Sequence, residues 1–124
     1  MNNYKEWISR ADSNLLIAQT AQKGGGLYYE DLCNQLHQAV EKGLKGLLVF
    51  FGEDPPKTHD LLNLLSRLEK YVEITDDILD KTLQIDRYSV NIKYPGNYDP
   101  VTLEDFEEAL VNVEKYIIWI KHLV

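Results

Sequence analysis

Residues 28–51 read YYEDLCNQLHQAVEKGLKGLLVFF and carry the longest helical pattern of the chain. Apolar or small residues recur in it every three or four positions, which is the period of one face of an α-helix. Gly52 and the two prolines at 55 and 56 end the pattern, because proline cannot continue a helix. We therefore predict a long amphipathic helix over residues 28–51. Its inward-facing positions are Leu32, Leu36, Ala39, Val40, Gly43, Leu44 and Leu47.

Two glycines, Gly43 and Gly46, lie inside this predicted helix. Each costs about 1 kcal/mol relative to alanine in a helix interior. We expect them to permit the close approach of a neighbouring helix, and contact with a ligand is the alternative.

One helix is predicted before this stretch and one after it. The first covers about residues 3–22 and ends at the glycine triplet 24–26, because glycine readily adopts the positive φ of a helix exit. The other begins near Thr58, whose hydroxyl can accept a hydrogen bond from an unpaired first-turn N–H group.

The C-terminal part of the chain predicts one short helix and one long helix. Thr75 precedes two aspartates, as at many helix starts. Thr102 and Asp105 have the spacing of a capping box, which opens the final helix. The apolar residues of that helix follow heptad spacing: Phe106, Leu110, Val113, Ile117, Ile120 and Val124.

The sequence lacks alternating strand patterns bounded by hairpin turns, and only residues 88–94 have β-like composition. The proline and glycine cluster at 95–100 excludes a helix there. We predict an all-α fold in one domain over residues 1–124: an up-and-down antiparallel four-helix bundle with one additional short helix.

The chain of 124 residues has 13 Lys and Arg against 20 Asp and Glu, so its formal net charge is −7. This balance excludes general DNA binding, which depends on neutralising phosphates. Residues 73–108 hold ten acids and three bases and account for the acidity. This segment is either a solvated connecting face or an acidic docking surface for a basic partner.

The cellular location is predicted from the N-terminus and the cysteine content. The chain begins with a polar stretch, and its longest apolar run is five residues, at 47–51. We therefore expect neither a signal peptide nor a membrane span. A single cysteine, Cys33, fits a reducing compartment, so we expect a cytoplasmic protein.

Polar residues form a stripe on the helix over 28–51. Gln35, Gln38, Lys42 and Lys45 lie close to one face, and Glu41 stands four residues before Lys45. The stripe is either a solvated face with one ion pair or a site for phosphate or carboxylate groups.

Two further clusters contain polar or basic residues. His59 and Asp60 follow the two prolines at a predicted helix N-terminus, where they either bind an anion or complete the helix cap. Arg87, Lys93 and Tyr94 precede the turn at 95–100, and they either contact a nucleotide or pair with neighbouring acids.

Several chemistries are not expected. The glycine triplet fits neither the dinucleotide nor the P-loop motif. The three histidines and the single cysteine lack the spacing of metal ligands, so we expect no metal and no cofactor. Cys33 and His37 are four residues apart, but a buried, inert cysteine is the favoured interpretation.

The stretch 38–48, QAVEKGLKGLL, is followed by THDL at 58–61. Together they resemble the HEPN domain (higher eukaryotes and prokaryotes nucleotide-binding). The resemblance continues in Trp7 and Ala11, in the tyrosines at 28 and 29, and in KYP at 93–95, so it covers essentially the whole chain.

The resemblance implies a helical bundle that forms a homodimer and is often paired with a minimal nucleotidyltransferase chain. By resemblance, Lys42 and Lys93 would supply charge to a phosphate, and His59 would be a hydrogen-bond donor oriented by Asp60. Asp60 would alternatively accept from a ribose, and Tyr94 would stack on a base. The implied nucleotide-binding residues are Lys42, Lys45, His59, Asp60, Lys93 and Tyr94.

Other members of the family are ribonuclease toxins that use an arginine and a histidine four to six residues apart. None of Arg10, Arg67 and Arg87 has a histidine at that separation. Lysine also stands at 93, where many small prokaryotic relatives have an arginine. We therefore expect a noncatalytic partner of a nucleotidyltransferase. The alternatives are a ribonuclease toxin of a toxin–antitoxin pair, and a purely structural oligomerisation bundle.

Overall fold

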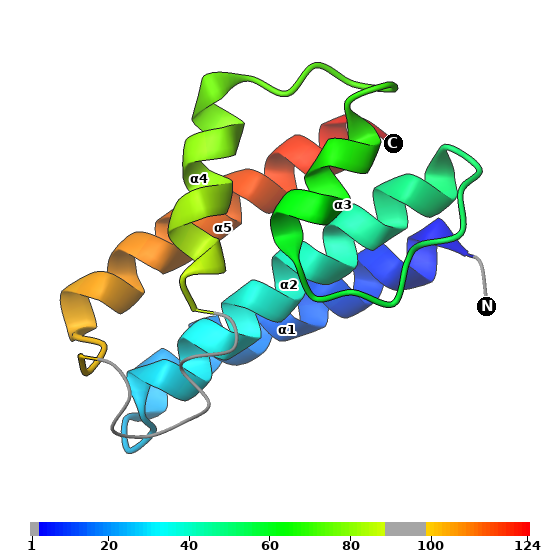
Figure 1. The fold of residues 1–124 in the computed structure, drawn as a ribbon. Coiled ribbons are helices and arrows are strands. Elements are labelled where there is room, and N and C mark those ends of the chain that lie inside the picture. Colours follow the sequence, from blue (N-terminus) through cyan, green and yellow to red (C-terminus); the bar gives the residue numbers. More distant parts are fainter. Residues whose placement is uncertain (1–2, 89–98) are drawn as a thin grey trace.

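The computed structural model describes residues 3–88 and 99–124, and these form five helices (Figure 1). The described residues contain no strand, so the predicted all-α bundle is confirmed. The helices are α1 (Tyr4–Gly24), α2 (Tyr29–Phe50), α3 (Leu61–Leu68), α4 (Asp76–Asp86) and α5 (Leu103–His122).

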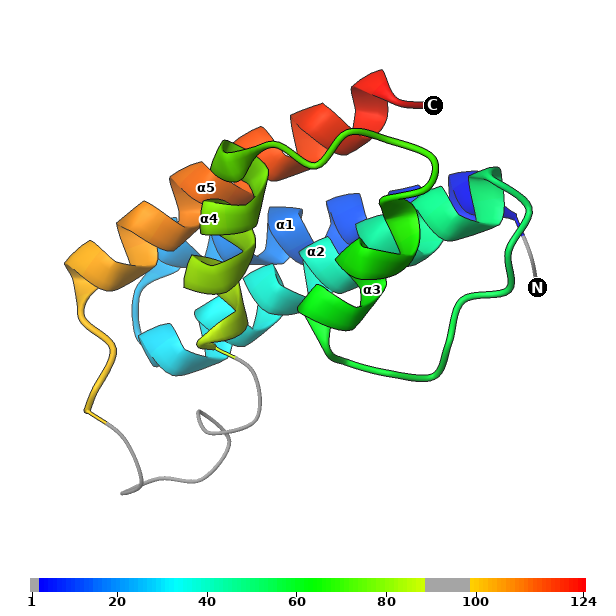
Figure 2. The same ribbon diagram turned by 45° about the horizontal axis from the view of Figure 1, so that its top comes forward.

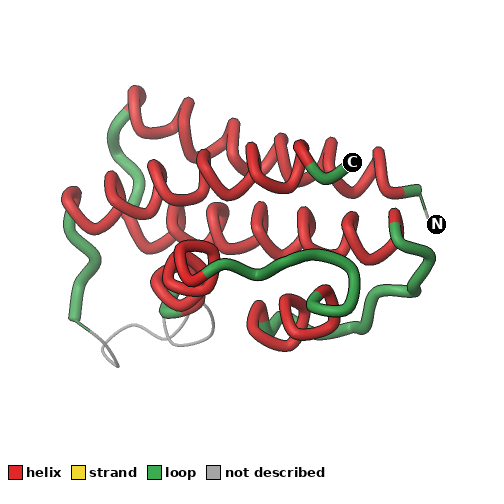
Figure 3. Tube along the Cα trace, turned by 90° about the horizontal axis from the view of Figure 1, so that it is seen from above, coloured by secondary structure: helices red, strands yellow, loops and turns green. Residues whose placement is uncertain are grey.

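The three long helices lie side by side, and α1 runs opposite to α2 and α5 (Figure 1). The two shorter helices lie across this layer, so that Figure 3 shows them nearly end-on. Figure 2 shows α4 against α5 and α3 against α2. The third helix, α3, has only eight residues and is therefore not one of the long helices of the bundle.

Local capping explains where most helices begin and end. Thr75 caps α4, and Thr102 and Asp105 form the predicted capping box of α5. The glycine triplet ends α1, with Gly25 at φ 67°. The predicted Thr58 cap of the third helix is wrong: Asp60 is the cap and accepts from the amides of Leu62 and Asn63.

The core lies between α2 and the other helices. Phe106, Val113, Ile117 and Ile120 of the heptad pattern are buried, whereas Val124 at the chain end is exposed. The apolar face of α2 contributes the largest buried set of any helix: Leu32, Cys33, Leu36, Ala39, Val40, Leu44, Leu47 and Leu48.

The predicted close approach at the α2 glycines is confirmed. A Cβ atom at Gly43 would lie 2.6 Å from Ile120 Cδ1 of α5. A Cβ atom at Gly46 would lie 3.0 Å from Trp7 Cβ of α1. The two glycines therefore let α2 pack closely against both long neighbours.

Among the described residues, none of the helices is long and apolar enough to cross a membrane.

Candidate functional site

A row of polar side chains follows one face of α2 within the core. His37, Glu41 and Lys45 stand at successive four-residue steps, which places them one above the other on the helix. All three are buried. Buried charges need partners, so the contacts of this row show what it does.

Glu41 is the centre of the row. Its Oε2 atom lies 3.0 Å from Lys45 Nζ and 3.0 Å from His59 Nδ1, and its Oε1 atom lies 3.1 Å from the same histidine nitrogen. The side chains of Glu41 and Lys45 are only 10% and 9% exposed. The ammonium group also lies 6.0 Å from the centroid of the Trp7 ring on α1, so the lysine charge is held inside the fold.

The contact with Glu41 orients the His59 ring. An ionised carboxylate only accepts hydrogen bonds, so Nδ1 of His59 must carry the hydrogen. The other ring nitrogen, Nε2, is then left for an external partner, and the His59 side chain is 78% exposed. This nitrogen accepts a hydrogen bond when the ring is neutral and donates one when it is protonated.

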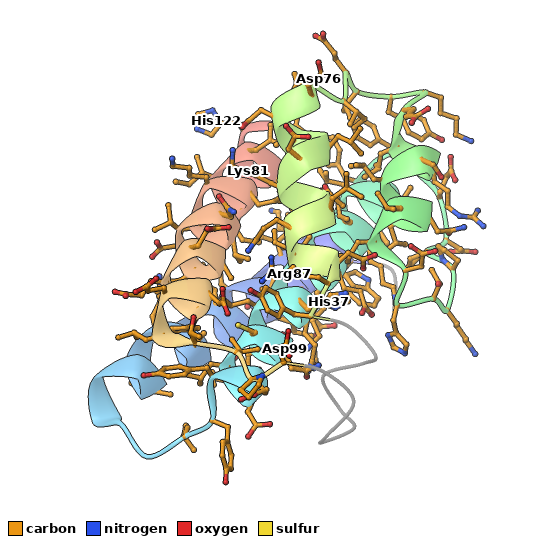
Figure 4. All side chains as sticks on the ribbon, turned by 60° about the vertical axis from the view of Figure 1, so that its left-hand side comes forward. His37, Asp76, Lys81, Arg87, Asp99 and His122 are labelled. Carbon is orange, nitrogen blue, oxygen red and sulfur yellow. The ribbon has the colours of Figure 1, made fainter. Side chains whose placement is uncertain are left out.

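His37 connects α2 to the end of α4. Its Nε2 atom lies 3.2 Å from Asp86 Oδ1, and Figure 4 shows His37 where the end of α4 meets α2. Burial lowers the pKa of His37 below its usual 6.5, although the hydrogen bond to Asp86 opposes this. The ring is therefore neutral near pH 7, and its role is a buried contact between helices.

The predicted site residues Lys42 and Asp60 contact residues outside the predicted site. Lys42 Nζ donates to Asn14 Oδ1 on α1 at 2.8 Å, and Asn14 donates in turn to Gln35 at 2.7 Å. Asp60 caps α3, and the carboxylate that contacts His59 is that of Glu41. Lys93 and Tyr94 lie outside the described residues, as does most of the β-like stretch 88–94.

Cys33 stands one turn before His37 and is fully buried. Burial raises the pKa of its thiol to about 12, and the nearby carboxylates of Asp105 and Glu30 act in the same direction. The thiol is therefore protonated and unreactive at neutral pH. Cys33 belongs to the packing of α2.

The three arginines all contact residues other than histidine. Arg10 pairs with Glu6, Arg67 Nε donates to Asn63, and Arg87 pairs with Asp105 at 3.6 Å. Arg87 also lies over the ring of Tyr88, and Figure 4 labels it near the end of α4. Within residues 3–88 and 99–124, the chain therefore has no hydrogen bond between an arginine and a histidine.

The chain matches the model of the HEPN domain over residues 4–123, which is almost its whole length. The chain belongs to the HEPN family. This HEPN domain is also similar to the crystal structure of TT1696 from Thermus thermophilus, with 28% identity and a TM-score of 0.88. That similarity covers 100% of both chains. No curated protein gives a significant match.

Sequence reasoning misses two contacts in this HEPN domain. It identifies Glu41 only as an ion-pair partner of Lys45, whereas the hydrogen bond that Glu41 accepts from His59 joins residues 18 apart in the sequence. It relates His37 only to Cys33, although the partner of His37 is Asp86. The four-residue spacing of His37, Glu41 and Lys45 is the available signal, because it places all three on one helix face.

Proposed function

We propose that this HEPN domain is a noncatalytic subunit that forms a homodimer and acts with a minimal nucleotidyltransferase chain. In this proposal it offers that chain a nucleotide- or substrate-binding surface around His59. One observation carries the binding part of the proposal: Glu41 pairs with Lys45 inside the fold and leaves the His59 ring outside, with Nε2 available. The homodimer and the nucleotidyltransferase partner rest on the family alone.

The chemistry of this surface suits a small anionic ligand better than a long nucleic acid. The charges of Glu41 and Lys45 offset one another, so the group that this surface offers to a ligand is Nε2 of His59, which can either accept or donate a hydrogen bond. It would contact a ribose hydroxyl when neutral and a phosphate oxygen when protonated. By family resemblance, Lys93 would add positive charge and Tyr94 would stack on the base.

The contacts of the arginines support a noncatalytic role. In the ribonuclease members of the family, an arginine and a histidine act together. Here Arg87 is engaged by Asp105, and Arg67 is engaged by Asn63 on its own helix. Among the described residues, the exposed His59 ring has Glu41 as its partner and contacts no arginine.

Isothermal titration of ATP into the purified protein tests the binding part, with and without the nucleotidyltransferase chain. We expect binding heat, and an affinity that falls at least tenfold in His59→Ala. The matched control is His122→Ala, which removes an exposed histidine at the far end of α5 and should bind as the wild type does. Absence of heat under both conditions would remove the binding part.

Sedimentation at several protein concentrations tests the homodimer separately. We expect a dimer at micromolar concentration. A monomer that persists across the whole range would contradict this part of the proposal.

A second candidate function is ribonuclease activity through His59. The specific observation in its favour is the Glu41 contact, because a carboxylate on Nδ1 orients an imidazole for general-base chemistry at Nε2. The test is RNA cleavage by purified protein, with His59→Ala alongside. Cleavage that His59→Ala retains would exclude His59, and absence of cleavage by the wild type would exclude the activity.

A further inference from the structure

A groove of about 310 Å³ lies between α3 and the beginning of α4. The segment that joins the two helices contributes Glu69, Val72, Glu73 and Ile74 to its lining, and Figure 1 shows the path of this segment between α3 and α4. Its floor and walls are mainly apolar. The apolar lining residues are Leu62, Leu65, Val72, Ile74 and Leu79.

Leu79 is the most exposed apolar side chain of this lining, at 39%. Leu83 stands one helical turn later on α4 and is also exposed. These side chains give the outer side of α4 an apolar strip beside the groove. Burying such surface against another apolar group is favourable, at about 25 cal/mol per Å².

The rim of the groove is acidic. Glu69 and Glu73 line it, and Asp76 and Asp80 are exposed on the neighbouring turns of α4. Among the side chains that the structure describes, which leave out residues 1–2, 22–24 and 89–98, none of these four carboxylates forms an ion pair. The lysines close by in sequence are already engaged, since Lys70 pairs with Glu53 and Lys81 pairs with Asp77.

We propose that this groove binds a basic amphipathic segment of a partner protein. The apolar side chains of that segment would enter between α3 and α4, and its lysines or arginines would meet the four carboxylates. The charge argues against the other occupants: a nucleic acid would be repelled by the rim, and a second copy of this chain carries a net charge of −7. This proposal is independent of the function proposed for His59.

The groove can be tested with two synthetic helical peptides on the isotope-labelled full chain, followed by NMR chemical-shift mapping. Both peptides have the same leucine pattern, and one has lysines where the other has glutamates. We expect the lysine peptide to shift the amides of α3, residues 69–75 and α4, and the glutamate peptide to leave them unchanged.

Variants then separate the rim from the apolar lining. Glu69→Gln/Glu73→Gln removes two exposed carboxylates without changing the core, and we expect the lysine peptide to bind at least fivefold more weakly. Leu79→Ser should weaken it about tenfold. Glu104→Gln/Glu107→Gln, which makes the same charge change on α5, should alter the affinity less than twofold.

Three results would overturn the proposal. One is binding of the lysine peptide at a different surface, and another is equal weakening by the α5 control and the rim variant. The third is concentration-dependent shifts of the groove amides without any peptide, which would identify a second copy of the chain as the occupant. Raising the salt concentration should weaken the peptide complex, because exposed ion pairs are screened.

Discussion

Removal of Glu41 tests the buried charge pair on which the candidate site is built. In Glu41→Leu, Lys45 is left as a cation with a side chain only 9% exposed, and its remaining contact is the Trp7 ring. Breaking a buried pair from one side leaves an uncompensated charge, so we expect a loss of about 3 kcal/mol in the free energy of unfolding.

Removal of the lysine instead of the glutamate should reduce the free energy of unfolding by a smaller amount. In Lys45→Met, the Glu41 carboxylate keeps its hydrogen bonds to His59, so we expect a loss of about 1.5 kcal/mol, as for one charged hydrogen bond. The double variant Glu41→Leu/Lys45→Met removes both buried charges and should also lose about 1.5 kcal/mol. The coupling energy between the two sites is then about 3 kcal/mol.

The assay is urea unfolding followed by circular dichroism, at one pH and one protein concentration for all variants. The control is Arg10→Met, which breaks an exposed pair with the same four-residue spacing and should change stability by less than about 0.5 kcal/mol. A loss below about 1 kcal/mol in Glu41→Leu would show that Lys45 is not left as an uncompensated buried charge. A double variant whose loss equals the sum of the single losses would show that the two side chains are not coupled.

Three further predictions concern the packing, the capping and the pH dependence of the fold. Gly46→Leu should lose at least about 2 kcal/mol in urea unfolding, because a Cβ there already lies 3.0 Å from Trp7 Cβ; wild-type stability would contradict the close approach. Asp60→Ala should lose about 1 kcal/mol and Thr58→Ala clearly less, and the reverse order would restore Thr58 as the cap. The free energy of unfolding should fall as the pH is lowered from about 7.5 through 6.5, because burial lowers the pKa of His37 and the unfolded chain then binds the proton first. His37→Gln should reduce that dependence, and an unchanged slope between about pH 7.5 and 5 would show that His37 is not its source.

Most helix boundaries could be predicted from the sequence because their signals are local. The capping box at Thr102 and the cap at Thr75 each depend on residues within one turn. The start of α3 is predicted less sharply, since Thr58 and Asp60 are both good caps and the cap at Asp60 is only one of two alternatives for that residue. Thr58 instead accepts a hydrogen bond from the Asp60 amide, and the helix begins at Leu61.

Of the contacts in the candidate site, only those between residues of the same helix can be predicted from the sequence. The pair between Glu41 and Lys45 follows from their four-residue spacing. The hydrogen bond that Glu41 accepts from His59 does not follow from spacing, because it depends on how the proline-containing loop returns to α2. The family resemblance likewise suggests that Asp60 orients His59, but Asp60 instead accepts hydrogen bonds from the amides of its own helix.

The binding surface proposed around His59 depends on the tautomer of its ring and on the response of that ring to ATP. Nitrogen-15 NMR of the imidazole ring distinguishes a protonated nitrogen from an unprotonated one. At a pH where the ring is neutral, we expect hydrogen on Nδ1, held by Glu41, and a bare Nε2 whose resonance moves on addition of ATP. Hydrogen on Nε2, or an Nε2 resonance that stays fixed while ATP binds, would show that Glu41 does not orient the His59 ring toward this ligand.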